Sequence, residues 1–152
     1  MSRLTPGQPA PDFELPDQNG NVVRLSQFRG HRAVVIFFYP KDDTAGCTVE
    51  ACGFRDNFPE FDRRGTEVIG ISSDSGYSHQ QFSTKFDLPF TLLSDAKGRV
   101  RRLYGASGLF GGLIPGRVTY VIDRSGIVRH VFSSQTRFMQ HVSEALGALA
   151  QS

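Results

Sequence analysis

Short apolar runs rich in β-branched and aromatic residues recur along the chain at the spacing of sheet strands. The clearest is Ala33 to Phe38, which Tyr39-Pro40 ends because proline has no N–H to give to a sheet. Polar and apolar residues alternate in two segments, 12–15 and 22–25, which flank an Asn-Gly pair and predict a β-hairpin. Similar patterns predict further strands over 67–72, 90–93, 117–122 and 127–132.

Between these strands the apolar positions follow the helical period. They predict one helix that begins at residue 47 and others over 76–86, 97–104 and 136–150. Pro59 predicts a kink or break of the first helix near 57–59, because proline removes a helical hydrogen bond. Ser26 is expected to cap a short turn that follows the hairpin.

Strands that alternate with helices, then a hairpin and a final helix, predict an α/β fold with a central mixed sheet flanked by helices. The chain has 152 residues with no internal repeat or linker, so a single domain over 1–152 is expected.

Charge and hydropathy exclude some partners. The net charge is +2 with no long basic run, which argues against nucleic acid or an anionic membrane as the main partner. No apolar stretch approaches the roughly 20 residues that a membrane span requires. The N-terminus shows neither an apolar signal region nor a long transit segment, which predicts a cytoplasmic protein.

Both cysteines lie in the stretch that follows the first long strand, between Pro40 and Cys52. The thiolate is the reactive form of cysteine, and a helix N-terminus favours it through unpaired N–H groups and the helix dipole. Residues 44–50 look like such a helix start. Cys47 is therefore expected at or just before the first turn, exposed but positioned, with the Thr44 hydroxyl within reach of its sulfur.

Cys52 follows Cys47 by five residues, which matters for any bond between them. Five residues of continuous helix advance about 7.5 Å and turn about 500°. A disulfide needs Cα atoms roughly 4.4–6.8 Å apart. We therefore hypothesise that the pair bonds only if the first turn or two of the helix unwind. A bonded pair within an intact helix over 47–53 would refute this.

Several segments carry a family resemblance. Pro40-Lys41-Asp42-Asp43-Thr44-Ala45-Gly46-Cys47 resembles the peroxiredoxin signature, in which a proline, a threonine and the peroxidatic cysteine recur at this spacing. The second cysteine resembles that of the peroxiredoxin Q subfamily, also called bacterioferritin comigratory protein. The resemblance implies a thioredoxin-like fold. Further similar segments are Pro9-Ala10-Pro11-Asp12-Phe13, Ser72-Ser73-Asp74 and Gly116-Arg117-Val118-Thr119-Tyr120-Val121-Ile122-Asp123.

The resemblance also implies a thiol-dependent peroxidase that reduces hydrogen peroxide and organic hydroperoxides. The Cys47 thiolate would attack the peroxide and become a sulfenic acid, which Cys52 would resolve as an intramolecular disulfide. Arg117, which the sequence alone would suggest is a surface residue, would stabilise the thiolate and the leaving oxygen. Thr44 would hydrogen-bond the peroxide or simply cap the helix, and Pro40 would shield the thiolate from water.

The same resemblance implies partners and cofactors. It implies recycling by thioredoxin or a related dithiol protein, no metal, flavin or heme cofactor, and a monomer, with a weak dimer as the alternative.

Glu50 and Thr48 suit a first helical turn by charge and capping. Glu50 is also a candidate for orienting an arginine, with a surface charge as the alternative. Core or solvated roles, without metal-ligand spacing, are expected for His31, His79, His130 and His141.

Two other functions fit part of the pattern. A copper-handling or redox-sensing protein would need both cysteines and a later histidine to converge, which the Cys-x4-Cys spacing disfavours. A thiol–disulfide oxidoreductase usually carries Cys-x-x-Cys instead.

The glycine-rich stretch 105–116 fits no regular element. Its apolar side chains form either ordinary core or a patch beside the active site. Such a patch could dock a reductant, a second subunit or an organic peroxide tail. These side chains are Leu109, Phe110, Leu113 and Ile114.

Overall fold

A five-stranded sheet in the order β5-β4-β3-β6-β7 forms the centre of the computed structural model, which describes residues 3–108 and 115–150. Strands β4 and β5 extend it in parallel from β3, whereas β6 pairs antiparallel with β3 and β7 antiparallel with β6. The predicted mixed sheet is therefore confirmed. The strands are β3 (Ala33–Phe38), β4 (Thr66–Ser72), β5 (Thr91–Ser94), β6 (Val118–Ile122) and β7 (Val128–Ser133).

The predicted N-terminal hairpin is also confirmed. Strands β1 (Glu14–Pro16) and β2 (Val22–Arg24) pair antiparallel as a separate two-stranded sheet. The 3-10 helix η1 (Leu25–Phe28) follows directly with Arg24 at its N-cap, so the prediction that Ser26 caps this turn is wrong. The Ser26 N–H instead donates to the Asp12 carboxylate.

Helix α1 (Ala45–Asp56) starts two residues before the predicted position. The predicted break is confirmed, because α1 ends before Asn57 and α2 (Phe58–Arg63) begins with proline in its first turn. A proline fits there because the first N–H groups of a helix have no helical partner. The other helices are α3 (Gly76–Lys85), α4 (Arg99–Leu103) and α5 (Phe138–Ala150).

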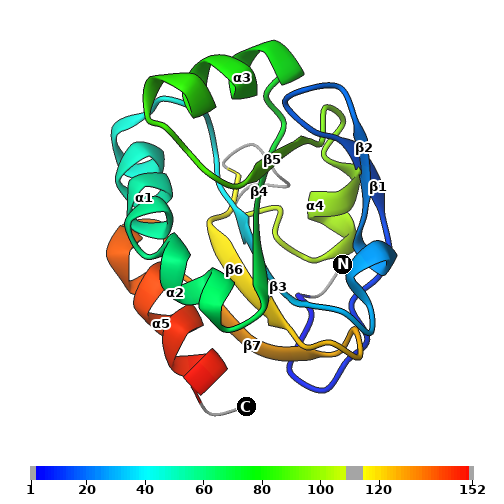
Figure 1. Cartoon of the computed structure of the whole chain (residues 1–152). Coiled ribbons are helices and arrows are strands. Elements are labelled where there is room, and N and C mark those ends of the chain that lie inside the picture. The colour runs from blue at the N-terminus through cyan, green and yellow to red at the C-terminus, as the bar shows by residue number, and fades with distance from the viewer. Residues whose placement is uncertain (1–2, 109–114, 151–152) are drawn as a thin grey trace.

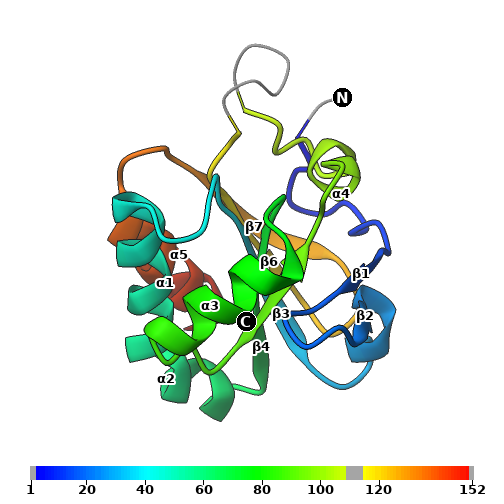
Figure 2. The same ribbon diagram turned by 90° about the horizontal axis from the view of Figure 1, so that it is seen from above.

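The helices cover both faces of the sheet (Figures 1 and 2). Helices α1, α2 and α5 lie on one side, and α4 lies with the β1–β2 hairpin on the other. Consecutive residues of β3 point to opposite faces, so Val35 and Phe37 join one apolar cluster while Ile36 and Phe38 join the other. A strand buried on both faces explains the unbroken apolar run in the sequence.

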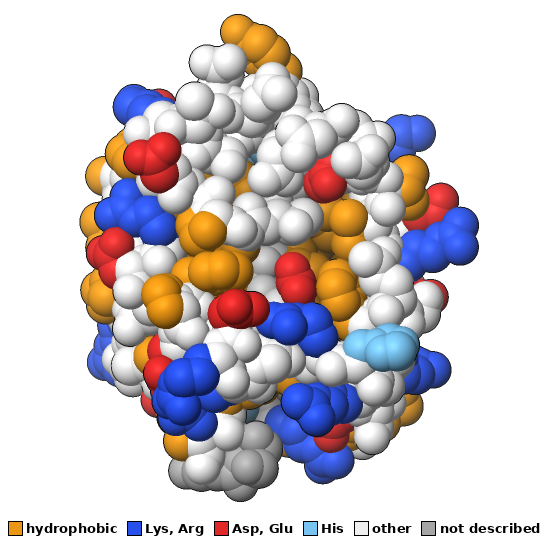
Figure 3. Space-filling view, in the orientation of Figure 1, with side chains coloured by type: hydrophobic (Ala, Val, Ile, Leu, Met, Phe, Trp, Pro, Cys, Tyr) orange, Lys and Arg blue, Asp and Glu red, His pale blue; other side chains and the backbone are white. Residues whose placement is uncertain are grey.

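The surface in Figure 3 intersperses acidic and basic side chains with apolar ones between them. This mixture agrees with the small net charge of +2. In the described part of the chain, no helix has the length and apolar character that crossing a membrane would require. The predicted apolar patch from Leu109 to Ile114 lies outside the described residues.

Candidate active site

The pairing of β3 with β6 brings Arg117 to the cysteine-bearing loop. Phe38, the last residue of β3, pairs with Val118, the first of β6, and the two strands are antiparallel. The chain that leaves β3 at Tyr39 therefore meets the chain that enters β6 at Arg117. Helix α1 starts from the same end of the sheet, after a short loop.

Cys47 lies in the first turn of α1, where the helix N-terminus favours a thiolate. Its side chain is only 1% exposed and belongs to the apolar cluster on the α1 face of the sheet. The prediction of an exposed sulfur is therefore wrong. The cause is the packing of α1 on the sheet, where Cys47 shares an apolar cluster with Phe37 and Tyr39. Both Cys47 and Cys52 are free thiols.

Arg117 is buried and held on three sides. Its Nη1 donates to Glu50 Oε1 at 2.7 Å, and its Nε donates to the Gln135 carbonyl at 3.1 Å. Its guanidinium lies over the Phe138 ring, 4.8 Å from the centroid. The surface position that the sequence alone suggests for Arg117 is thus wrong, and its guanidinium is fixed beside α1.

Gly46 allows this close approach. A Cβ at Gly46 would lie 2.5 Å from the Phe138 ring and 3.3 Å from Arg117 Nη2. Arg117 Nη2 is therefore next to the residue that precedes Cys47. Phe138 is a site residue that sequence analysis missed, because nothing in its local pattern distinguishes it from a core phenylalanine of α5.

Glu50 is fully buried in the second turn of α1, so the expectations of a first-turn role and of a surface charge are both wrong. It instead forms the predicted contact with an arginine. Burial raises the pKa of Glu50 to about 8, although Arg117 acts in the opposite direction. Its Oε2 atom has no hydrogen-bond partner among the described residues and lies 3.5 Å from His141 Nδ1.

His141 is buried behind Glu50 and is neutral. Its Nε2 lies 2.8 Å from the Ser134 carbonyl, which accepts only, so Nε2 carries the proton. Its Nδ1 then accepts from the Thr119 hydroxyl at 2.8 Å. Burial lowers the pKa of His141 to about 4, and Arg117 adds to this effect. The core role expected for this histidine is confirmed.

Thr44 and Pro40 lie in the loop before α1. Thr44 is the N-cap residue, but its side chain makes no capping hydrogen bond, so the capping alternative is wrong. Its hydroxyl is exposed and donates to the Lys41 carbonyl at 2.8 Å. Among the described residues, neither side chain makes a hydrogen bond to Cys47. Pro40 is half-buried and directly follows the buried Tyr39.

Cys52 lies on the same continuous helix, half-buried, one and a half turns after Cys47. Burial raises the pKa of its thiol, which Arg55 partly opposes. In the intact helix Cys52 is thus a weakly ionised thiol, held away from Cys47 by helix geometry.

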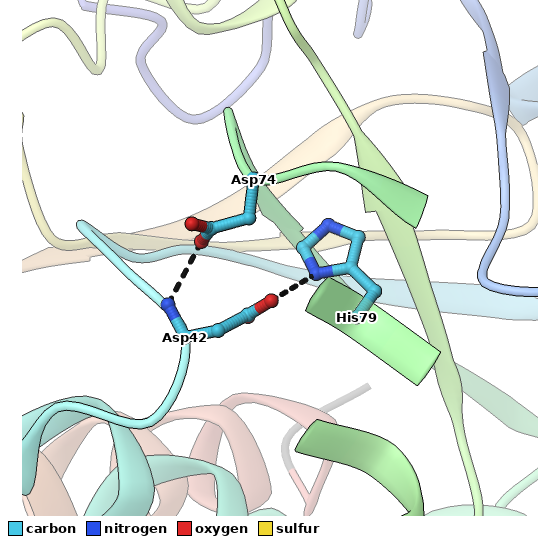
Figure 4. Close-up of side chains that lie close together, drawn as sticks. All are labelled: Asp42, Asp74 and His79. Carbon is cyan, nitrogen blue, oxygen red and sulfur yellow. Dashed lines mark hydrogen bonds and ion pairs between the residues drawn. The ribbon is translucent and has the colours of Figure 1, made fainter. Parts of the chain in front are cut away.

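A second buried polar cluster anchors the loop, and sequence analysis missed it. Asp42, Asp74 and His79 place ligand-type atoms within 4.8 Å of one another (Figure 4). Their oxygens already accept hydrogen bonds. Asp42 accepts from Tyr39, Ser78 and His79, and Asp74 accepts from the Asp42 N–H and from Ser72. The cluster therefore works as an anchor between the loop and α3.

This cluster also bears on the copper-binding alternative. It is the group of potential metal ligands found in the described part of the chain, and it contains neither cysteine. The described residues thus give no support to a copper site built on Cys47 and Cys52.

A buried thiol at a helix N-terminus, faced by a fixed arginine, on a mixed α/β sheet, defines a thiol-based redox protein. Residues 6–131 match the model of the AhpC/TSA family, so the chain belongs to that family. It is a thiol-dependent peroxidase, an oxidoreductase.

Within this family the chain is similar to peroxiredoxin Q proteins. It is 48% identical over 147 residues to the chloroplastic peroxiredoxin Q of Suaeda salsa, covering 96% of this chain and 68% of the relative. Among solved structures, peroxidoxin BcpB from Mycobacterium tuberculosis superposes with a TM-score of 0.91 at 40% identity, with 98% of each chain covered. The bacterioferritin comigratory protein of Xanthomonas campestris, whose structure is described through alkyl peroxide reduction, superposes with a TM-score of 0.84 at 30% identity. This match covers 91% of this chain and 90% of that chain.

Proposed function

We propose that the protein reduces hydrogen peroxide and organic hydroperoxides with Cys47 as the peroxidatic residue. The Cys47 thiolate attacks one peroxide oxygen, the O–O bond breaks, and the sulfur becomes a sulfenic acid. The other oxygen leaves as hydroxide or alkoxide and takes a proton to become water or an alcohol. Organic substrates are included because the related Xanthomonas campestris protein is described through alkyl peroxide reduction.

The observation that carries this proposal is the position of Arg117. Its Nη1 is fixed by Glu50 at 2.7 Å, and its Nη2 approaches Gly46, the neighbour of Cys47. A prepositioned guanidinium stabilises the charge on the leaving oxygen without reorganisation during the reaction. Thr44 would turn its hydroxyl from Lys41 to the bound peroxide, and Pro40 would keep water from the thiolate.

Cys52 completes the proposed cycle. Its thiolate attacks the sulfenic sulfur, the S–O bond breaks, and a Cys47–Cys52 disulfide forms while the oxygen leaves as hydroxide and takes a proton to become water. This step requires the first turns of α1 to open, because the intact helix separates the two sulfurs. Thioredoxin or a related dithiol protein then reduces the disulfide. We also propose a monomer in the cytoplasm; the curated relative named above is chloroplastic.

The test is stopped-flow mixing of the reduced protein with hydrogen peroxide, in the wild type and in Cys52→Ser. Mass measurement and free-thiol counts follow. Rapid loss of both thiols in the wild type, with a sulfenic acid trapped in Cys52→Ser, is the expected result. A rate comparable to that of free cysteine would overturn the proposal.

A further inference from the structure

Arg101 is a buried charged residue that the steps above do not use. It belongs to the short helix α4, on the sheet face opposite α1, and is only 7% exposed. Its side chain crosses the Phe38 ring, 5.6 Å from the centroid, to reach the end of β3. Burying a guanidinium is costly unless hydrogen bonds or a charged partner compensate it.

The hydrogen bonds of Arg101 join three segments that converge on the site. Its Nη2 donates to the Tyr39 carbonyl at 2.6 Å, and its Nη1 donates to the carbonyls of Gly116 at 2.6 Å and Ala106 at 3.1 Å. Tyr39 and Gly116 directly precede Pro40 and Arg117 in the chain.

The backbone at Gly116 is packed so closely that a side chain does not fit. A Cβ there would lie 2.8 Å from the Ala106 carbonyl oxygen and 3.1 Å from the Gly108 nitrogen. One rigid guanidinium fork therefore fixes the start of β6 against the end of β3 and the segment after α4.

The charge of Arg101 has no close carboxylate partner. Among the described residues no ion pair includes it. Asp95 interacts with it at longer range, but the Asp95 carboxylate is already occupied by the N–H groups of Val100 and Arg101. Arg101 also interacts electrostatically with Cys47 and, unfavourably, with Arg117. The guanidinium is thus held mainly by the three backbone carbonyls, and Asp95 is the acidic side chain that interacts with it most strongly.

We propose that Arg101 is a positioning residue of the peroxidase site, which fixes the backbone before Pro40 and Arg117 from the opposite face of the sheet. This inference rests on the proposed role of Cys47. Arg101 acts through backbone position, without contacting the peroxide.

The test compares Arg101→Met and Arg101→Lys with Arg102→Met, all in a Cys52→Ser background with one thiol. Arg102 is the matched control, because it lies on the same helix, is exposed, and donates only to the Lys97 carbonyl. Two rates are measured: the oxidation of Cys47 by hydrogen peroxide, which needs the positioned Arg117, and the alkylation of Cys47 by iodoacetamide, which needs only the thiol. Circular dichroism confirms that each variant is folded.

Arg101→Met is expected to slow oxidation by hydrogen peroxide about tenfold, because the Tyr39 and Gly116 carbonyls lose the fork that positions Pro40 and Arg117. Its alkylation should stay close to the rate of the parent protein. Arg102→Met should leave both rates unchanged. A folded Arg101→Met that reacts with hydrogen peroxide like Arg102→Met overturns the inference.

Arg101→Lys keeps the test decisive if Arg101→Met does not fold. It retains the charge but cannot reach the three carbonyls with one rigid fork. Its oxidation by hydrogen peroxide should fall several-fold while its alkylation stays unchanged, and an unchanged oxidation rate would overturn the positioning role. Failure of the proposed function looks different, since the parent protein itself would then react with hydrogen peroxide no faster than free cysteine does.

Discussion

The His79 ring lies 2.7 Å from the Asp42 carboxylate, and this buried pair holds the loop that leads to Cys47 (Figure 4). The second ring nitrogen of His79 lies 2.9 Å from the Leu93 carbonyl, which is also an acceptor. Both ring nitrogens are therefore held by hydrogen bonds in the buried interior. Asp42 is further held through its own N–H, which donates to Asp74 at 2.8 Å.

Replacing one member of this pair should cost more than replacing both. His79→Leu leaves the buried Asp42 carboxyl group without this hydrogen bond and should lower the free energy of unfolding by about 3 kcal/mol. Asp42→Ala should have an effect of similar size. The double variant should be more stable than the sum of the two losses predicts, because neither polar group is left buried without its partner. Urea unfolding measures all three.

The exposed His31 provides the control for this cycle. His31→Leu should change the free energy of unfolding by less than about 0.5 kcal/mol. Strict additivity of the Asp42 and His79 effects would contradict an energetic coupling between the two side chains.

Arg117→Met should lower the rate of Cys47 oxidation by about 10²- to 10³-fold while the protein stays folded. The fold should survive because the remaining Glu50 has a pKa raised by burial and can stay protonated when its partner is removed. Stopped-flow oxidation and thermal unfolding are measured together. A rate near that of the wild type would rule out the role of Arg117 in the reaction.

Glu50 should make the protein less stable as the pH rises towards 8. Its pKa is about 8 when folded and near 4.5 when unfolded, so the folded chain holds a proton that the unfolded chain has released. The stability due to this proton is complete below pH 4.5 and is lost as the pH rises through 8. Glu50→Gln cannot titrate, so its stability relative to the wild type should increase from pH 6.5 to 8.

The window from pH 6.5 to 8 avoids His141. Its pKa is about 4 when folded and 6.5 when unfolded, so its contribution is complete above pH 6.5 and is lost only as the pH falls towards 4. Glu14→Gln, on the exposed hairpin, is the matched control and should keep the wild-type slope. Parallel curves for Glu50→Gln and the wild type would show that Glu50 is ionised throughout.

Gly46→Ala should disturb the site through packing alone. The new Cβ would lie 2.5 Å from the Phe138 ring, so the ring must move away, and the Arg117 guanidinium that stacks on it loses support. We expect a loss of about 1–3 kcal/mol of stability and slower oxidation of Cys47. Gly147→Ala, in the exposed middle of α5 with nothing within 4 Å, should instead stabilise the protein by about 0.5–1 kcal/mol. Equal effects of the two substitutions on denaturant unfolding would refute the packing argument.

Periodicity and turn chemistry were sufficient to predict the strands and helices, because each depends on residues close in the sequence. The run Ala33–Phe38 and the break at Pro59 are examples. The Glu50–Arg117 contact could be proposed only from the family resemblance and the charge of each residue, since 67 positions separate them. Their meeting depends on the register of β3 with β6.

The burial of Cys47 and the roles of Phe138, His79 and Arg101 could not be predicted from local patterns. The burial of Cys47 depends on an apolar cluster whose members come from distant parts of the chain. Arg101 resembles its neighbours Arg99 and Arg102 in sequence, and only the position of α4 against the end of β3 distinguishes it.

Oxidation should open the first turns of α1. A Cys47–Cys52 bond cannot form across an intact helix, because five residues separate the Cα atoms by about 7.5 Å along the axis. Oxidised wild-type protein should therefore exchange the amide hydrogens of residues 47–52 much faster than the reduced protein, while α5 keeps its protection. Opening would also expose Cys52. Burial in the intact helix raises the pKa of the Cys52 thiol, so its attack on the sulfenic acid becomes easier once the helix has unwound. Hydrogen exchange with mass spectrometry measures this, with oxidised Cys52→Ser as the control in which no disulfide forms. Unchanged protection of 47–52 in a protein shown by mass to contain the disulfide would contradict the opening.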